Sequence, residues 1–138
     1  MALVGCKRNK NNLNTFEMDN IHLKVLSEKE LDQVKVYSIE LSNQTDHVIV
    51  QNEVYLSYPL INMTQSKQND LVVRGRNNKL NIKQNEKVLL DFYIPRNILN
   101  TQMIDYENPH MEIIGYSDEV TDKHRFQKSG DLKLYFQK

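Results

Sequence analysis

Residues 34–60 carry the feature that most restricts how this chain can fold. The segment VKVYSIELSNQTDHVIVQNEVYLSYPL places apolar side chains at alternate positions on both sides of a polar turn at residues 42–46. Alternation with a period of two puts such side chains on one face of a β-strand. We therefore predict two strands here, and we expect them to pair as the central hairpin of an antiparallel β-fold.

Further segments repeat the alternation, and polar stretches separate them. We expect polar connections at 27–32, 62–70 and 117–130, and a helical turn at 96–100. The additional strands are expected at about residues 17–27, 71–74, 80–82, 87–95, 111–116 and 132–137.

These seven or eight short strands in a chain of 138 residues favour an all-β sandwich or barrel. An antiparallel immunoglobulin-like β-sandwich fits the length best, because such domains take about 100 residues. The chain has one cysteine and no tryptophan, so it lacks the Cys-Trp-Cys pattern of antibody domains. We predict a flexible tether at residues 1–14 and one sandwich domain at residues 15–138.

The charge balance bounds the possible partners. Eighteen basic and eighteen acidic residues cancel, so no net field attracts nucleic acid or anionic lipid. No run of 18 apolar residues occurs in this sequence. A single cysteine, Cys6, excludes an intramolecular disulfide.

Residues 3–6 (LVGC) end on that cysteine, and a charged, Asn-rich stretch follows them. This pattern resembles the lipobox of bacterial lipoproteins. In that family the cysteine thiol receives a diacylglycerol, and cleavage before the cysteine then makes this residue the new N-terminus. The resemblance implies lipid attachment at Cys6, with residues 7–14 as the tether to the membrane. A signal peptide also needs about 7–15 apolar residues ahead of the box. Since two residues precede it here, we expect that segment upstream of Met1, either because the chain was shortened or because its start was assigned too late.

A strand ending in LSNQT (41–45), the long strand after it and a late FYIP (92–95) form a second pattern, which spans roughly residues 15–138. The pattern is similar to small immunoglobulin-like domains of Gram-positive lipoproteins and immunoprotective extracellular antigens. That resemblance implies an extracytoplasmic location, with the domain anchored to the bacterial membrane through lipidated Cys6. The family has no shared catalytic residues to carry over.

We expect no catalytic residues, metal site or cofactor. No histidine lies at zinc-ligand spacing from another ligand, and four glycines leave no phosphate-binding loop. The segment that contains Asp118, Glu119, Asp122 and His124 could hold Ca²⁺ through its carboxylate oxygens, but it lacks the alternate acids and turning glycine of a calcium loop. A solvated connection between strands is the preferred interpretation.

Tyrosines supply the candidate binding residues. Alternation places Tyr55, Tyr93, Tyr116 and Tyr135 opposite the predicted core positions of their strands, and exposed aromatic rings suit contact with proteins or glycans. The alternative is that tyrosine covers half-wet strands because of its β-propensity. We therefore predict a non-enzymatic domain that binds a protein or cell-envelope component. The other hypothesis is a small inhibitor or immunity-type protein that blocks an enzyme through loop 62–70 or 117–130.

Overall fold

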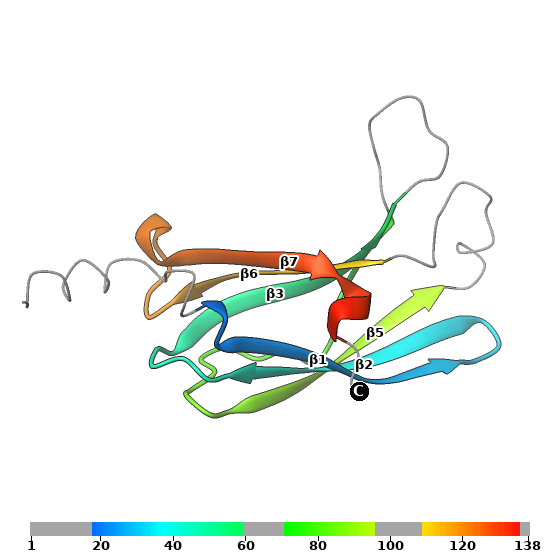
Figure 1. The fold of residues 1–138 in the computed structure, drawn as a ribbon, viewed down its shortest axis with the longest axis horizontal. Helices are drawn as coiled ribbons and strands as arrows, with labels where there is room; N and C mark the ends of the chain where they lie inside the picture. Colours follow the sequence, from blue (N-terminus) through cyan, green and yellow to red (C-terminus); the bar gives the residue numbers. More distant parts are fainter. Residues whose placement is uncertain (1–17, 60–70, 96–108, 136–138) are drawn as a thin grey trace, which may run out of the picture.

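Two antiparallel sheets pack face to face in the computed structural model, which describes residues 18–59, 71–95 and 109–135 (Figure 1). One sheet has the strand order β1-β2-β5, and the other has the order β4-β3-β6-β7. The strands are β1 (Ile21–Glu30), β2 (Val34–Asn43), β3 (Ile49–Tyr58), β4 (Leu71–Arg74), β5 (Lys87–Pro95), β6 (His110–Ser117) and β7 (Arg125–Asp131), with short 3₁₀ helices η1 (Asp122–His124) and η2 (Leu132–Tyr135).

This arrangement confirms the predicted immunoglobulin-like β-sandwich. The first, second and fifth strands form one layer, as they do in antibody constant domains, and the third, sixth and seventh form the other. In those domains the fourth strand joins the first layer. Here β4 pairs with β3 instead, along residues 55–58 and 71–74.

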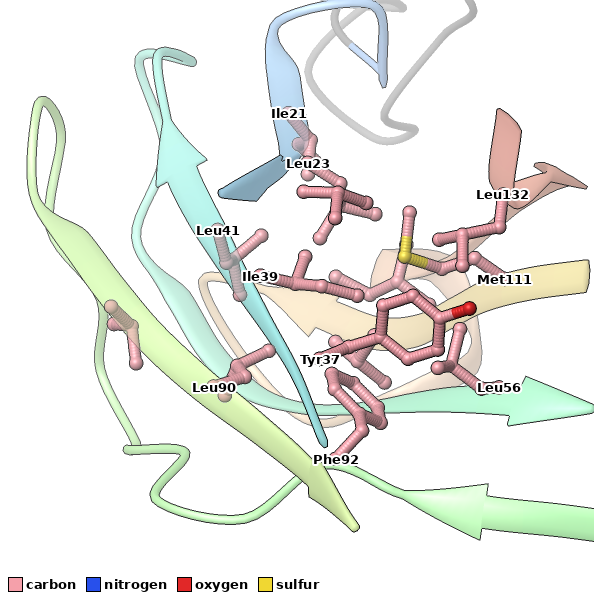
Figure 2. Packing of buried hydrophobic residues seen from close by; sticks show 14 of the residues in the cluster. Ile21, Leu23, Tyr37, Ile39, Leu41, Leu56, Leu90, Phe92, Met111 and Leu132 are labelled. Atoms are coloured by element: carbon pink, nitrogen blue, oxygen red, sulfur yellow. The ribbon is translucent and has the colours of Figure 1, made fainter. Parts of the chain in front are cut away.

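Alternate side chains of the strands fill the space between the layers. Val88, Leu90, Phe92 and Ile94 of β5 are all buried, as the alternation predicts. Figure 2 shows side chains of the two sheets meeting in this core, including Ile39, Leu90, Leu56 and Met111. Burying one such aliphatic or aromatic side chain contributes about 1.5–3 kcal/mol, so these rows supply most of the drive to fold.

The predicted hairpin at residues 34–60 is wrong. β2 pairs with β1 and β5, whereas β3 pairs with β4 and β6, so the turn carries the chain from one sheet to the other. The first residue of β3, Ile49, pairs with Ile82 rather than with β2. Alternation is the same for two strands of one sheet and for two strands facing each other, which is why the pattern did not separate these cases. The predicted strand at 80–82 is this isolated bridge.

β1 is longer than predicted, because it continues through the expected connection 27–32 to Glu30. A register shift between Val25 and Ser27 breaks the alternation at that point. Beyond it, the Lys35 ammonium lies 2.7 Å from a carboxylate oxygen of Glu28. Burial alone would lower the pKa of Lys35, but the hydrogen bond to Glu28 and the nearby Tyr37 outweigh it and raise that pKa. The end of β1 is thus held to β2 by an ion pair, and a search for alternating apolar residues assigns this part of β1 to a loop.

The last strand is also misplaced in the prediction. β7 lies within the expected connection 117–130 and extends to Asp131, and η2 takes up residues 132–135 of the expected strand. β7 is an edge strand, paired with β6 alone. It contributes one fully buried apolar side chain, Phe126, so the strand has too few apolar residues to show a period of two. The predicted helical turn at 96–100 lies outside the described residues, as do the tether and Cys6.

Lys128 of β7 ties the two sheets together. Its ammonium donates hydrogen bonds to the backbone carbonyl oxygens of Met18 at 3.0 Å and Ile21 at 2.9 Å, next to the start of β1. Burial lowers the pKa of this lysine. We expect Lys128→Met to lower the free energy of unfolding by about 2 kcal/mol, since the buried carbonyls lose a charged donor.

Urea denaturation monitored by circular dichroism measures this change. Lys123→Met is the matched control, because Lys123 is exposed in η1 and should change stability by less than about 0.5 kcal/mol. Equal stabilities of the two variants would show that the link between Lys128 and β1 contributes nothing.

Candidate binding surface

The structure brings two of the four candidate tyrosines together. Tyr55 of β3 and Tyr116 of β6 are half-buried on the outer face of the four-stranded sheet, opposite the core positions of their strands. In the strand register Tyr55 pairs with Glu112, and Tyr116 pairs with Gln51, so the two rings come from adjacent strands. The predicted outward placement of both residues is therefore correct.

A shallow depression of about 120 Å³ lies between these tyrosines. Its lining comes from neighbouring positions of β3 and β6: Gln51, Asn52, Glu53, Tyr55, Ile114, Gly115 and Tyr116. Gly115 and a register shift between Ile49 and Gln51 bring the two backbones close together at this point. Two aromatic rings and one aliphatic side chain beside a few polar groups make a surface suited to an apolar protrusion or a sugar ring.

Polar and charged side chains surround this depression, and several of them pair with one another. Arg74 Nε of β4 lies 3.7 Å from Glu53 Oε1, and Gln127 Nε2 of β7 donates a hydrogen bond to the Glu112 carboxylate. Farther along the same face, His110 Nδ1 lies 3.0 Å from Asp131 Oδ1. The face therefore presents a mixed polar rim rather than a field of one sign, which fits a neutral contact region better than a polyanion.

The other two tyrosines have different surroundings. Tyr93 lies on the outer face of the three-stranded sheet, with the Arg76 guanidinium 4.5 Å from the centre of its ring. Tyr135 belongs to η2, packs against the core and has a pKa raised by burial. Both rings thus have intramolecular partners, and neither adjoins the depression between Tyr55 and Tyr116.

Sequence reasoning missed most of the depression's lining. Gln51, Glu53 and Ile114 alternate with core residues, which is the signal that marks them as outward-facing. Their proximity depends on the pairing of β3 with β6, and no local motif specifies that pairing. The role of Gly115 as a close contact between two backbones follows only from the structure.

Three of the four histidines, His47, His110 and His124, lie beside carboxylates rather than in ligand clusters. His47 Nδ1 lies 2.6 Å from Asp118 Oδ2, and His124 Nε2 lies 3.3 Å from Glu119 Oε2. Within residues 18–59, 71–95 and 109–135, no group of three His, Cys, Asp or Glu side chains could hold a metal ion. Over those same residues there is no helix of the length and apolarity that crossing a bilayer requires.

The segments predicted as inhibitory loops are only partly described. Residues 62–70 lie outside the described residues. Of the segment 117–130, positions 118–124 connect β6 to β7, and Arg125 onward belongs to β7. This connection also contacts the residue before β3, because the Asp118 N–H donates a backbone hydrogen bond to the Val48 carbonyl at 2.8 Å.

Comparison with known proteins assigns no family. No family model matches the chain, and no curated protein matches it either. Among solved structures, the chain is similar to a crystal structure of β-glucosidase from Kluyveromyces marxianus, with 12% identity and a TM-score of 0.35. That similarity covers 80% of this chain and 14% of the β-glucosidase chain. It is too low to carry an argument about function.

Proposed function

We propose that this chain is the extracytoplasmic, non-enzymatic binding domain of a bacterial lipoprotein, attached to the membrane through a lipidated Cys6. Its contact surface is the outer face of the four-stranded sheet around Tyr55 and Tyr116, and its ligand is a protein or a component of the cell envelope. The depression between these two tyrosines is the observation that supports binding most directly. The LVGC motif supports the membrane anchor.

The outer face of the four-stranded sheet has the features expected of a binding surface. Tyr55, Ile114 and Tyr116 are half-buried in the sheet, so their side chains lose little conformational freedom when a partner covers them. Tyrosine rings with restrained geometry are frequent anchors of interfaces. Gln51 and Glu53 add hydrogen-bonding groups beside them. The surface therefore combines an apolar centre with a polar rim.

The binding half of the proposal can be tested with the envelope fraction of the organism that carries the gene. A Cys6→Ser chain removes lipid attachment, so that sedimentation with the envelope reports on the domain alone. Adding Tyr55→Ser and Tyr116→Ser should weaken this binding at least about tenfold, since each ring is expected to contribute more than about 1 kcal/mol.

Tyr93→Ser in the same Cys6→Ser background is the matched control, because Tyr93 lies on the opposite sheet. It should leave envelope binding within about twofold of the parent chain. Equal loss in both variants, or no binding by the parent chain, would contradict a contact surface on the four-stranded sheet.

The anchoring half has an independent test. The gene with its native upstream region is expressed in a bacterial host, and the product is partitioned between detergent and water. The parent protein should enter the detergent phase and carry a diacylglyceryl adduct on Cys6 by mass spectrometry, whereas Cys6→Ser should remain in the aqueous phase. An unmodified Cys6 in the parent protein would refute the anchor and leave the binding surface untouched.

A further inference from the structure

A second depression lies on the outer face of the other sheet and differs in chemistry from the tyrosine surface. It measures about 250 Å³ and is lined by His22, Lys24, Glu40, Ser42, Gln44 and Lys87. These residues come from β1, β2, β5 and the first position after β2. We call this group the lysine depression.

The strand register explains why these side chains gather. His22 of β1 pairs with Ser42 of β2, and Ser42 pairs with Lys87 of β5, so the three lie in one row across the sheet. Lys24 pairs with Glu40 in the next outward-facing row. Neighbouring strands lie about 4.8 Å apart and residues two positions apart in a strand are separated by about 6.7 Å, so Lys24 and Lys87 flank the middle strand from roughly 12 Å apart. Flexible lysine side chains can converge over that span.

The charge of the lysine depression is positive although the whole chain is neutral. Two lysines face one glutamate, and His22 adds charge when protonated. Lys35 and Lys79 each form an ion pair with an acid, but among the described residues no carboxylate lies within 4.0 Å of the ammonium of Lys24 or Lys87. Both cations therefore remain available to an incoming anion.

Ser42 supplies a separate indication of a ligand. This residue is 5% exposed, and its Oγ accepts a hydrogen bond from Gln44 Nε2 at 2.8 Å. In the described part of the chain, no acceptor is paired with the hydroxyl proton of Ser42. A nearly buried donor at the base of a cationic depression is the arrangement that an anionic oxygen would satisfy.

We propose that the lysine depression binds a singly charged phosphate diester that carries a neighbouring hydroxyl group. Lys24 and Lys87 pair with the two non-bridging oxygens, and the Ser42 hydroxyl donates to one of them. Glu40 accepts a hydrogen bond from the ligand's hydroxyl group and disfavours more highly charged anions. Soluble glycerophosphodiesters and the headgroups of anionic phospholipids share this chemistry. The site is independent of the tyrosine surface proposed above.

Binding is measured on the full Cys6→Ser chain by ¹H–¹⁵N chemical-shift titration with glycerophosphoglycerol, and by sedimentation with phosphatidylcholine vesicles that contain or lack phosphatidylglycerol. We expect saturable shifts at Lys24, Ser42 and Lys87 with the soluble diester, saturable sedimentation with the vesicles that contain phosphatidylglycerol, or both. Response to the soluble diester identifies a free glycerophosphodiester as the source, and response to phosphatidylglycerol vesicles alone identifies the lipid headgroup. Lys24→Gln with Lys87→Gln should weaken binding about tenfold or more.

Two comparisons make this test specific. Lys29→Gln with Lys123→Gln removes the same charge elsewhere on the surface and should change affinity by less than about twofold. Glu40→Gln should tighten binding of inorganic phosphate and reduce the preference for the hydroxyl-bearing diester. An equal loss in the two double-lysine variants, or no saturable response to either ligand, would refute the site.

Discussion

Replacing Asn43 with alanine should lower the free energy of unfolding by roughly 3–4 kcal/mol, a large part of the stability of a domain this size. Asn43 is fully buried at the end of β2. Its Nδ2 donates to the carbonyls of His47 at 2.7 Å and Ile82 at 2.9 Å. Its Oδ1 accepts from the backbone N–H of Thr45 at 3.0 Å and from the Thr45 hydroxyl at 2.7 Å. Alanine would remove all four bonds and leave the Thr45 N–H without its acceptor, although the Ile82 carbonyl keeps the Ile49 N–H and the His47 carbonyl keeps the Thr45 hydroxyl.

The backbone of Asn43 extends the same network. Its N–H donates to the Glu86 carbonyl at 3.1 Å, and its carbonyl accepts from the Asn85 N–H at 2.6 Å. One residue therefore joins the turn between the sheets to the segment that precedes β5. Loss of the side chain is expected to weaken the crossing from β2 to β3 as a unit, and not merely one contact.

Chemical denaturation with fluorescence or circular dichroism measures the effect. Asp46→Ala is the control, since Asp46 is exposed in the same turn and should change stability by less than about 1 kcal/mol. Asn43→Asp keeps the acceptor but loses the amide donor, and burial would raise the pKa of the new carboxyl. That variant should be more stable near pH 4 than near pH 7, because the protonated acid can donate. Similar costs for Asn43→Ala and Asp46→Ala would contradict this account.

Asn43 also shows where sequence reasoning stops. Residues 42–46 were predicted as the polar turn of a hairpin, yet Ser42, Asn43 and Thr45 are buried. Asn and Ser or Thr often bond to nearby backbone groups, so the local turn was predictable. Asn43 bonds to Ile82 and Glu86, which lie some forty residues away from it in the sequence. Local composition does not report contacts at that separation.

The same distinction applies to the strands and the candidate sites. Alternation located β5 and β6 well, because both strands bury one complete face. It did not locate β7, because this edge strand buries few side chains and so shows no alternation of apolar residues. The outward positions of Tyr55 and Tyr116 were predictable, but their proximity depends on the register of β3 and β6. The lysine depression likewise joins β1 and β2 to β5, which is distant from them in the sequence, and the neutral total charge conceals it.

Gly115→Ala is the second substitution with a large expected effect, a loss of roughly 2–3 kcal/mol from overpacking. A Cβ at this position in β6 would lie 2.7 Å from the backbone oxygen of Gln51 and 2.9 Å from Asn52 Cβ. It would also lie 2.8 Å from Phe126 Cζ in the core. The strand backbone cannot move without breaking the pairing of β3 with β6, so the added methyl group cannot be accommodated without strain.

Gly130→Ala is the matched control on the neighbouring strand. A Cβ there would approach the Tyr135 hydroxyl to 3.1 Å, and that group is the far end of a side chain that can rotate away. We expect a change within about 1 kcal/mol for this variant. Both free energies of unfolding come from urea titrations, in which an unchanged slope confirms that the two variants unfold as the parent does. Because Gly115 lines the depression between Tyr55 and Tyr116, its alanine variant should also lose envelope binding, whereas a fully stable and fully binding Gly115→Ala protein would disprove the close approach of β3 and β6.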